Sequence, residues 1–164
     1  MKRDAAGPLD HRRARLVAAD LLSRRAWTRA DLTRRLRRRG APDDVAVDVV
    51  TDLVARGHVD DAAFALQWVS TRAARGYGAG RLRAELSVRG VDASVIGAAL
   101  AELDSGDALG RARAAAARRL SAIRADDPRR VAARLRDHLL RRGYPGGLVA
   151  RVVRESLGAR AADH

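Results

Sequence analysis

Apolar residues recur along this chain three and four positions apart, which is the spacing of amphipathic helices and not of strands. One arrangement occurs three times: two leucines four residues apart, followed by an arginine and a glycine. Its copies are Leu32, Leu36, Arg39 and Gly40; Leu82, Leu86, Arg89 and Gly90; and Leu135, Leu139, Arg142 and Gly143. The three glycines lie 50 and 53 residues apart, and the apolar positions after them also correspond, so the chain is predicted to contain three tandem repeats.

Each copy predicts two helices that are joined at the glycine. Leucines four residues apart share one helix face, and a glycine in the left-handed conformation ends a helix. The second helix of each pair is expected at residues 43–56, 93–103 and 146–157, and a longer helix is expected before each pair, at residues 10–24, 60–75 and 107–124. The first of these longer helices is predicted to be buried through Leu16, Ala19 and Leu22, and the second through Phe64, Trp68 and Thr71.

The predicted fold is all-α, with three tandem three-helix repeats (about nine helices) forming an elongated, curved array. The repeats are placed at residues 10–57, 58–103 and 104–158, with disordered tails at 1–9 and 159–164. A unit of three short helices buries little apolar surface alone, so neighbouring repeats are expected to stack.

Polar residues at the predicted helix starts are interpreted as caps. Thr28 with Asp31 resembles a capping box, and Asp127 precedes Pro128, a residue tolerated in a first turn. Asp60 and Asp61 are adjacent, so their side chains diverge and make a poor acid–base pair or metal site. One of them is expected to cap the helix that carries Phe64.

The net charge of +13 is concentrated in the two ends of the chain. Residues 1–57 carry +6, residues 58–103 carry zero and residues 104–164 carry +7, which predicts an acidic partner. Two arginine-rich helices are the candidate contact surfaces; they carry Arg34, Arg35, Arg37, Arg38 and Arg39 in the first repeat, and Arg130, Arg134, Arg141 and Arg142 in the third. Solvation is the alternative explanation for such surface arginines.

The segment from Gly76 to Gly80 superficially resembles a phosphate-binding loop. No strand precedes it and no Gly-Lys-Ser/Thr follows, so it is interpreted as a helix–helix turn and not as a nucleotide site. Tyr77 could still contact a partner or a backbone phosphate, because it is flanked in sequence by Arg72, Arg75, Arg81 and Arg83. Arg89, in the second repeat motif, is a further candidate contact.

Several function classes are excluded by what the sequence lacks. There is no cysteine, so disulfides and thiol chemistry are absent, and the four histidines do not have metal-ligand spacing. No nucleophile–base grouping suggests an enzyme, and no cofactor or metal is expected. No apolar stretch approaches the ~20 residues needed to span a membrane. A soluble, cytoplasmic, monomeric protein is expected.

The order of these motifs resembles the RecX family of modulators of the RecA recombinase. The resemblance rests on the Leu53–Ala65 segment (Leu-Val-Ala-Arg-Gly-His-Val-Asp-Asp-Ala-Ala-Phe-Ala), the Gly78-Ala-Gly80 turn, the second Leu-x3-Leu-x2-Arg-Gly copy and Arg141-Arg142-Gly143-Tyr144. It covers roughly residues 12–157. One departure is His58, where the family usually has an aromatic residue.

The resemblance implies a tandem three-helix fold and a regulatory, non-enzymatic function. It implies binding in the helical groove of the RecA filament on single-stranded DNA, with inhibition of the recombinase, ATPase and coprotease activities of RecA. Such a protein would modulate homologous recombination, DNA repair and the SOS response. The arginine-rich helices could contact RecA or the DNA directly.

The alternative interpretation is a basic, helix-turn-helix-like DNA-binding repeat protein. The second helix of each pair would then enter a major groove. These helices are apolar or acidic, and they lack the exposed Asn, Gln and Arg clusters that read bases.

Overall fold

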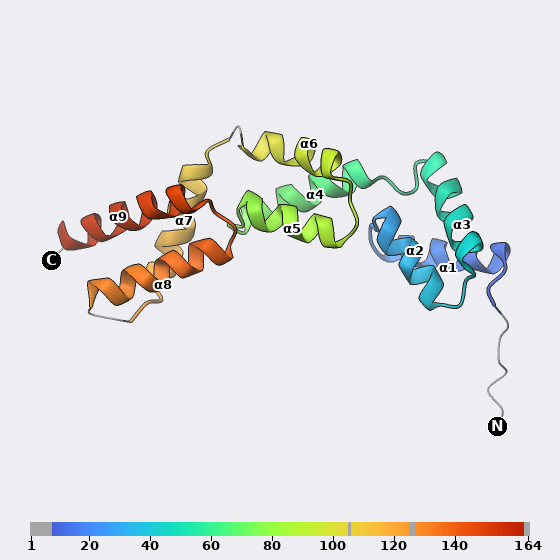
Figure 1. The fold of residues 1–164 in the computed structure, drawn as a ribbon, viewed down its shortest axis with the longest axis horizontal. Helices are drawn as coiled ribbons and strands as arrows, with labels where there is room; N and C mark the ends of the chain where they lie inside the picture. Colours follow the sequence, from blue (N-terminus) through green and yellow to red (C-terminus); the bar gives the residue numbers. More distant parts are fainter. Residues whose placement is uncertain (1–7, 105, 125–126, 163–164) are drawn as a thin grey trace, which may run out of the picture. The chain divides into compact units, whose positions relative to one another are not determined.

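The computed structural model describes residues 8–104, 106–124 and 127–162 (Figure 1). These residues form nine α-helices and no strand: α1 (His11–Arg24), α2 (Arg29–Arg38), α3 (Asp43–Ala55), α4 (Asp61–Ala74), α5 (Ala79–Val88), α6 (Ala93–Asp104), α7 (Ala108–Leu120), α8 (Pro128–Arg141) and α9 (Gly146–Ala162). The predicted all-α fold with three tandem three-helix domains is thereby confirmed, and every expected helix is present.

The tertiary contacts divide the chain into two compact units. Unit 1 contains the chain up to Ala65 together with Leu86–Val95, and unit 2 contains Leu66–Glu85 together with the chain from Ile96 onward. Each unit therefore includes part of the middle repeat, because α4, α5 and α6 all cross the division.

In unit 1, α1, α2 and α3 pack against one another around a small aliphatic core. Leu32 and Leu36 of α2 are fully buried, as the repeat pattern predicts. The stripe predicted for α1 is wrong: Leu16 is 65% exposed, and the helix packs through Ala14, Ala18 and Leu21 instead. Alanine lets neighbouring helices approach closely, so the face rich in small residues forms the contact here.

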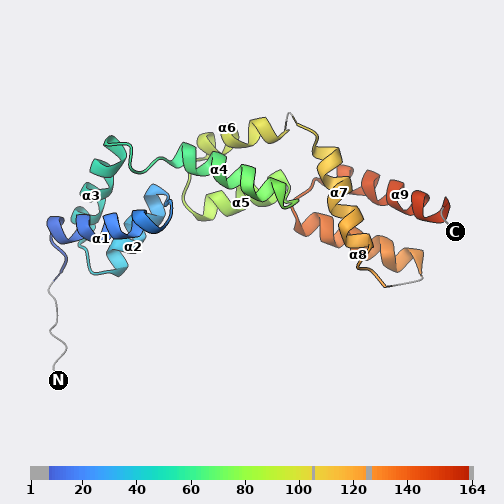
Figure 2. The same ribbon diagram turned by 180° about the vertical axis from the view of Figure 1, so that it is seen from behind.

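In unit 2, α7, α8 and α9 form the corresponding three-helix packing (Figure 2). Leu135 and Leu139 of α8 are fully buried, against three alanines of α7 and against Val149 and Val152 of α9. Tyr144, just after the third repeat glycine, is also in this core. In α4, Phe64 is buried and Trp68 half-buried, as expected, but Thr71 is exposed and the apolar face continues through Val69 and Ala73.

The predicted helix ends are confirmed by their hydrogen bonds. The Thr28 hydroxyl accepts from the Asp31 amide, and the Asp127 carboxylate caps α8 ahead of Pro128. Asp60 caps α4 by accepting from the Ala63 amide at 3.0 Å. The three repeat glycines have positive φ angles of 93°, 73° and 87° at Gly40, Gly90 and Gly143, which is the left-handed conformation expected after a helix.

The described residues extend beyond the predicted repeats at both ends. Residues 159–162 continue α9 as far as Ala162, where a disordered tail was expected, because Ala and Arg both favour helix. At the other end, Leu9 packs against the core of unit 1 and its amide donates to the Gly40 carbonyl at 2.9 Å. The remaining residues of the two expected tails, 1–7 and 163–164, lie outside the described residues.

Candidate partner-binding surfaces

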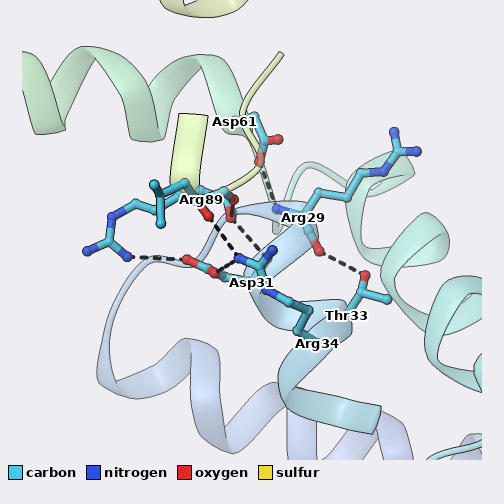
Figure 3. Close-up of polar contacts among 8 residues, drawn as sticks. Arg29, Asp31, Thr33, Arg34, Asp61 and Arg89 are labelled. Atoms are coloured by element: carbon cyan, nitrogen blue, oxygen red, sulfur yellow. Dashed lines mark hydrogen bonds and ion pairs between the residues drawn. The ribbon is translucent and has the colours of Figure 1, made fainter. Parts of the chain in front are cut away.

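The start of α2 is held by polar contacts to the end of the second Leu-x3-Leu-x2-Arg-Gly motif, within unit 1 (Figure 3). Thr28, the cap of α2, is fully buried, and its hydroxyl donates to the Arg89 carbonyl at 2.8 Å. The Arg29 amide donates to Asp61 at 2.8 Å. The first turn of α2 is therefore capped by its own threonine and by an aspartate from the next repeat.

Asp31 joins the two repeats electrostatically at the same place. Its carboxylate accepts from Arg34 of its own helix and from Arg89 at 3.2 Å, while Arg34 also donates to the Val88 carbonyl at 3.3 Å (Figure 3). Asp31 is only 17% exposed, so these bonds are better shielded than ordinary surface ion pairs. Asp31 and Arg89 thus hold the first repeat against the second.

An equivalent contact occurs in unit 2, between the turn before α5 and the third motif. The Gly78 amide donates to the Arg142 carbonyl at 2.7 Å, and the Gly80 amide donates to the Gly143 carbonyl at 3.1 Å. Gly78 lies at the start of α5 as Thr28 lies at the start of α2, and Arg142 corresponds to Arg89. The Gly76–Gly80 turn is therefore a helix–helix turn, as interpreted from the sequence, and its backbone anchors the next repeat.

Two side chains of the third motif strengthen this contact. The Arg142 guanidinium donates to the Arg75 carbonyl at 2.6 Å, and the buried Tyr144 hydroxyl donates to the Gly76 carbonyl at 3.1 Å. Burial is the main reason that the pKa of Tyr144 is raised, so the phenol stays protonated and remains a donor. In the first motif, the Gly40 carbonyl accepts its hydrogen bond from the Leu9 amide, whereas the corresponding Gly143 carbonyl accepts from the Gly80 amide of another repeat.

The double role of Thr28 leads to a stability prediction. Thr28→Val keeps the volume but removes the cap and leaves the Arg89 carbonyl without its donor, so we expect a loss of about 2 kcal/mol in the free energy of unfolding. Asp10→Ala is the matched control, because Asp10 caps α1 through the Arg13 amide and touches no other repeat; it should lose only about 1 kcal/mol. Urea denaturation followed by circular dichroism measures both, and equal losses would contradict the role of Thr28 between repeats.

Tyr77 lies among arginine side chains in unit 2. The guanidinium carbons of Arg72, Arg81 and Arg142 lie 4.9, 4.5 and 4.9 Å from the centre of its ring. The carboxylate of Glu85 holds two of these arginines: it accepts from Arg72 at 2.6 and 2.9 Å and from Arg81 at 2.9 Å. Trp68 donates a further bond to Glu85 at 3.0 Å. Glu85, the only carboxylate in α5, organises these arginines and was not among the residues predicted from the sequence.

The ionisation of Glu85 makes unit 2 sensitive to acid. Burial alone would raise the pKa of Glu85, but hydrogen bonds from Arg72, Arg81 and Trp68 outweigh it and lower the pKa from 4.5 to about 2. A carboxylate whose pKa is lower in the folded state stabilises the fold above its unfolded pKa, and this stabilisation is lost as the pH falls from about 4.5 towards 2.

We therefore expect Glu85→Gln to cost roughly 2 kcal/mol at pH 7 and much less at pH 2.5. The measurement is the free energy of unfolding as a function of pH for both proteins. The difference between them isolates Glu85 from other acidic groups. A constant difference across this pH range would show that the charge of Glu85 does not contribute.

The predicted partner-binding arginines divide into engaged and available groups. Arg34, Arg37, Arg72, Arg81, Arg89 and Arg142 bind carboxylates or backbone carbonyls of the protein itself, and Arg130 lies 3.7 Å from Asp127. Within the described ranges, no acceptor lies in reach of the guanidinium groups of Arg38, Arg39, Arg75, Arg134 and Arg141, and all five residues are exposed. Arg35 is half-buried, and its Nε has no hydrogen-bond partner among the described residues.

A cleft of about 480 Å³ lies beside α2 in unit 1. Arg29, Arg34 and Arg37 line it on α2, Val47 and Val50 on α3, and Asp61 and Asp92 close it. Its charges largely cancel, because the aspartates face the arginines and Arg37 is bound to Asp43 at 2.9 Å. The cleft is therefore less attractive to an acidic partner than the exposed arginines.

The residues that the structure describes contain no cluster of three or more His, Asp or Glu side chains that could hold a metal ion. No helix in those ranges is both long enough and apolar enough to cross a membrane.

Sequence comparison identifies three consecutive segments of one family. The first three-helix domain of RecX matches residues 14–53, the second matches 60–100 and the third matches 107–153. The chain belongs to the RecX family. The three RecX segments fall on α1–α3, α4–α6 and α7–α9, so each contains one copy of the Leu-x3-Leu-x2-Arg-Gly motif.

Individual RecX proteins are similar over nearly the whole chain. The regulatory protein RecX of Thermobifida fusca is 42% identical over 161 residues, covering 97% of this chain and 87% of its own length. The RecX of Mycobacterium avium is 43% identical over 154 residues, covering 93% and 89%. RecX proteins are regulatory proteins and not enzymes.

Solved RecX structures share the fold. A crystal structure of a regulatory protein RecX superimposes with a TM-score of 0.77 at 22% identity, covering 87% of this chain and 70% of its own. The RecX of Lactobacillus salivarius gives a TM-score of 0.73 at 21% identity, covering 89% and 96%. The RecX fold is thus reproduced in chains that retain only about a fifth of the residues.

Proposed function

We propose that this RecX-family chain binds the RecA filament on single-stranded DNA and inhibits RecA. In this proposal the protein lies along the helical groove of the filament and lowers the recombinase, ATPase and coprotease activities. It thereby modulates DNA repair and the SOS response. Family membership supports the regulatory role, and the three tandem domains support an extended contact, because weak contacts to successive protomers add through avidity.

One observation supports an acidic partner most directly: arginines without an internal counter-ion project from equivalent helices of the first and third repeats. Arg134 and Arg141 lie on the exposed side of α8, opposite the buried Leu135 and Leu139. Arg38 and Arg39 lie at the exposed end of α2. These charges have no internal counter-ion and therefore stay available to an acidic partner, and a filament of protein on DNA offers acidic groups.

The surface of α3 argues against the alternative of a duplex-reading repeat. Asp43 and Asp44 begin the helix, and Asp48 and Asp52 follow on its surface. Four carboxylates on the helix that would enter a major groove oppose the phosphates that flank it. The arginines that face them, such as Arg37 and Arg56, are already bound to Asp43 and Asp52.

Filament binding and ATPase assays test the proposal together. The purified full chain should bind RecA on single-stranded DNA with a non-hydrolysable ATP analogue, and near-stoichiometric amounts should lower DNA-dependent ATP hydrolysis by RecA. Duplex DNA without RecA is the comparison. Absence of both filament binding and ATPase inhibition would overturn the proposal, and tighter, sequence-selective binding to duplex DNA would favour the alternative.

A further inference from the structure

We propose that the arginine cluster around Tyr77 in unit 2 is a binding site for the phosphodiester backbone of single-stranded DNA. The cluster consists of three arginines at the Tyr77 ring (Arg72, Arg81 and Arg142), of which Glu85 binds two, together with Arg75 and Arg118 beside the adjacent Gly76 turn. The site belongs to unit 2 alone and does not require RecA, so it goes beyond the filament regulation proposed above.

The first argument is the concentration of positive charge. Glu85 neutralises about one of the three guanidinium groups at the ring, and Arg75 and Arg118 add two further charges near the Gly76 turn, so this part of unit 2 carries an excess of about four positive charges. Three of these groups lie within 5 Å of the ring centre. Guanidinium groups held this close repel one another, and an anion placed among them relieves that repulsion.

The same positive field acts on a neighbouring group. His138 accepts a hydrogen bond from Arg142 at 3.0 Å, which requires an unprotonated nitrogen. Burial lowers the pKa of His138 most, and the charges of Arg142, Arg119 and Arg141 lower it further. A second cation is thus disfavoured beside the cluster, as expected where the local potential is strongly positive.

The second argument is that donors remain available. Arg142 uses Nε and Nη1 for His138 and the Arg75 carbonyl, and Arg72 uses Nε and Nη2 for Glu85. The side chains of Arg75 and Arg118 are exposed and have no acceptor among the described residues. Arg118 nevertheless lies close to the turn: a Cβ added to Gly76 would be 2.7 Å from its Nη2. Glycine at position 76 therefore leaves room for this guanidinium beside the backbone.

The third argument concerns the kind of anion. Guanidinium forks match phosphate oxygens in geometry, and proteins that bind single-stranded nucleic acid combine such cations with an aromatic ring. Tyr77 is half-buried and contacts three arginines, so its ring holds them together against their repulsion through cation–π attraction.

The test uses the full chain, an oligothymidylate probe and no RecA. The side chains of Arg75 and Arg118 make no hydrogen bond or ion pair with the described residues, so R75Q/R118Q should fold normally, which circular dichroism verifies. We expect about tenfold weaker binding and a decrease of about 1.4 in the slope of log affinity against log salt, since each phosphate contact to a single strand contributes about 0.7.

The matched control is R83Q/R154Q, which removes two exposed, unpaired arginines of unit 2; Arg83 lies on the side of α5 away from Arg81. It should leave affinity and slope nearly unchanged. Tyr77→Phe should bind like the unmodified chain and Tyr77→Leu more weakly.

Absence of single-strand binding by the unmodified chain would overturn this proposal and leave filament regulation intact. Equal losses of affinity for single-stranded DNA in R75Q/R118Q and in R83Q/R154Q would also overturn the proposal. The proposal would also be overturned if R75Q/R118Q bound the RecA filament more weakly but bound single-stranded DNA as well as the unmodified chain does. That result would assign the cluster to an acidic protein surface.

Discussion

Gly143→Ala should destabilise unit 2 by roughly 3 kcal/mol, by combining backbone strain with a steric clash. Gly143 has φ +87°, and an added Cβ would overlap the backbone and Cβ of Arg81, which belongs to α5. Relief of this overlap would pull the third motif away from α5 and break the bond from the Gly80 amide to the Gly143 carbonyl. Urea denaturation of the full chain, followed by circular dichroism, measures the loss.

The repeats supply a matched control for this substitution. Gly40 occupies the same motif position with φ +93°, but an added Cβ there would meet no atom within 4 Å. Gly40→Ala should therefore show the strain alone, about 1 kcal/mol. Similar losses at the two positions would contradict the idea that the glycine of this motif also permits close contact between repeats.

Removing the available arginines of the first and third repeats should weaken filament binding strongly. R134Q/R141Q and R38Q/R39Q should each lower affinity for RecA on single-stranded DNA about tenfold, and the four changes together should abolish ATPase inhibition at stoichiometric concentration. The effect should diminish as salt is raised, because exposed charges are screened. Fluorescence anisotropy on labelled filaments provides the affinities.

R24Q/R56Q is the control for this experiment, because it removes the same charge from arginines that are already bound to Asp20 and Asp52 of their own helices. This pair should retain affinity within about twofold. If R24Q/R56Q loses as much affinity for the filament as the test pairs do, then the net charge of the protein, and not the position of the arginines, governs binding.

The predictions made from the sequence were accurate where a feature depends on residues close together in the chain, and less accurate where it depends on tertiary packing. Helix positions, the caps at Thr28, Asp60 and Asp127, and the left-handed glycines depend on residues only a few positions apart, and all were predicted. The face that α1 buries was mispredicted, because hydrophobicity favoured Leu16 whereas close helix packing selected Ala14 and Ala18.

The sequence did not show which arginines bind groups of the protein itself and which remain available to a partner. The repeat motif marked Arg89 and Arg142 as corresponding positions, but only the structure showed that they bind Asp31 and the Arg75 carbonyl. Glu85 was overlooked for the same reason, since one carboxylate in a helix has no distinctive spacing. Its importance comes from Arg72, on another helix and 13 residues earlier.

The sequence by itself determined the all-helical repeats, their caps and the excess of positive charge, because periodicity, capping and composition are local or additive properties. Only the tertiary structure decided which arginines hold the repeats together and which stay available to a partner. The hydroxyl of Thr28 meets the Arg89 carbonyl across 61 residues, and that of Tyr144 meets Gly76 across 68. Such contacts arise only when the repeats stack, because no local pattern encodes which backbone carbonyl a distant side chain will reach.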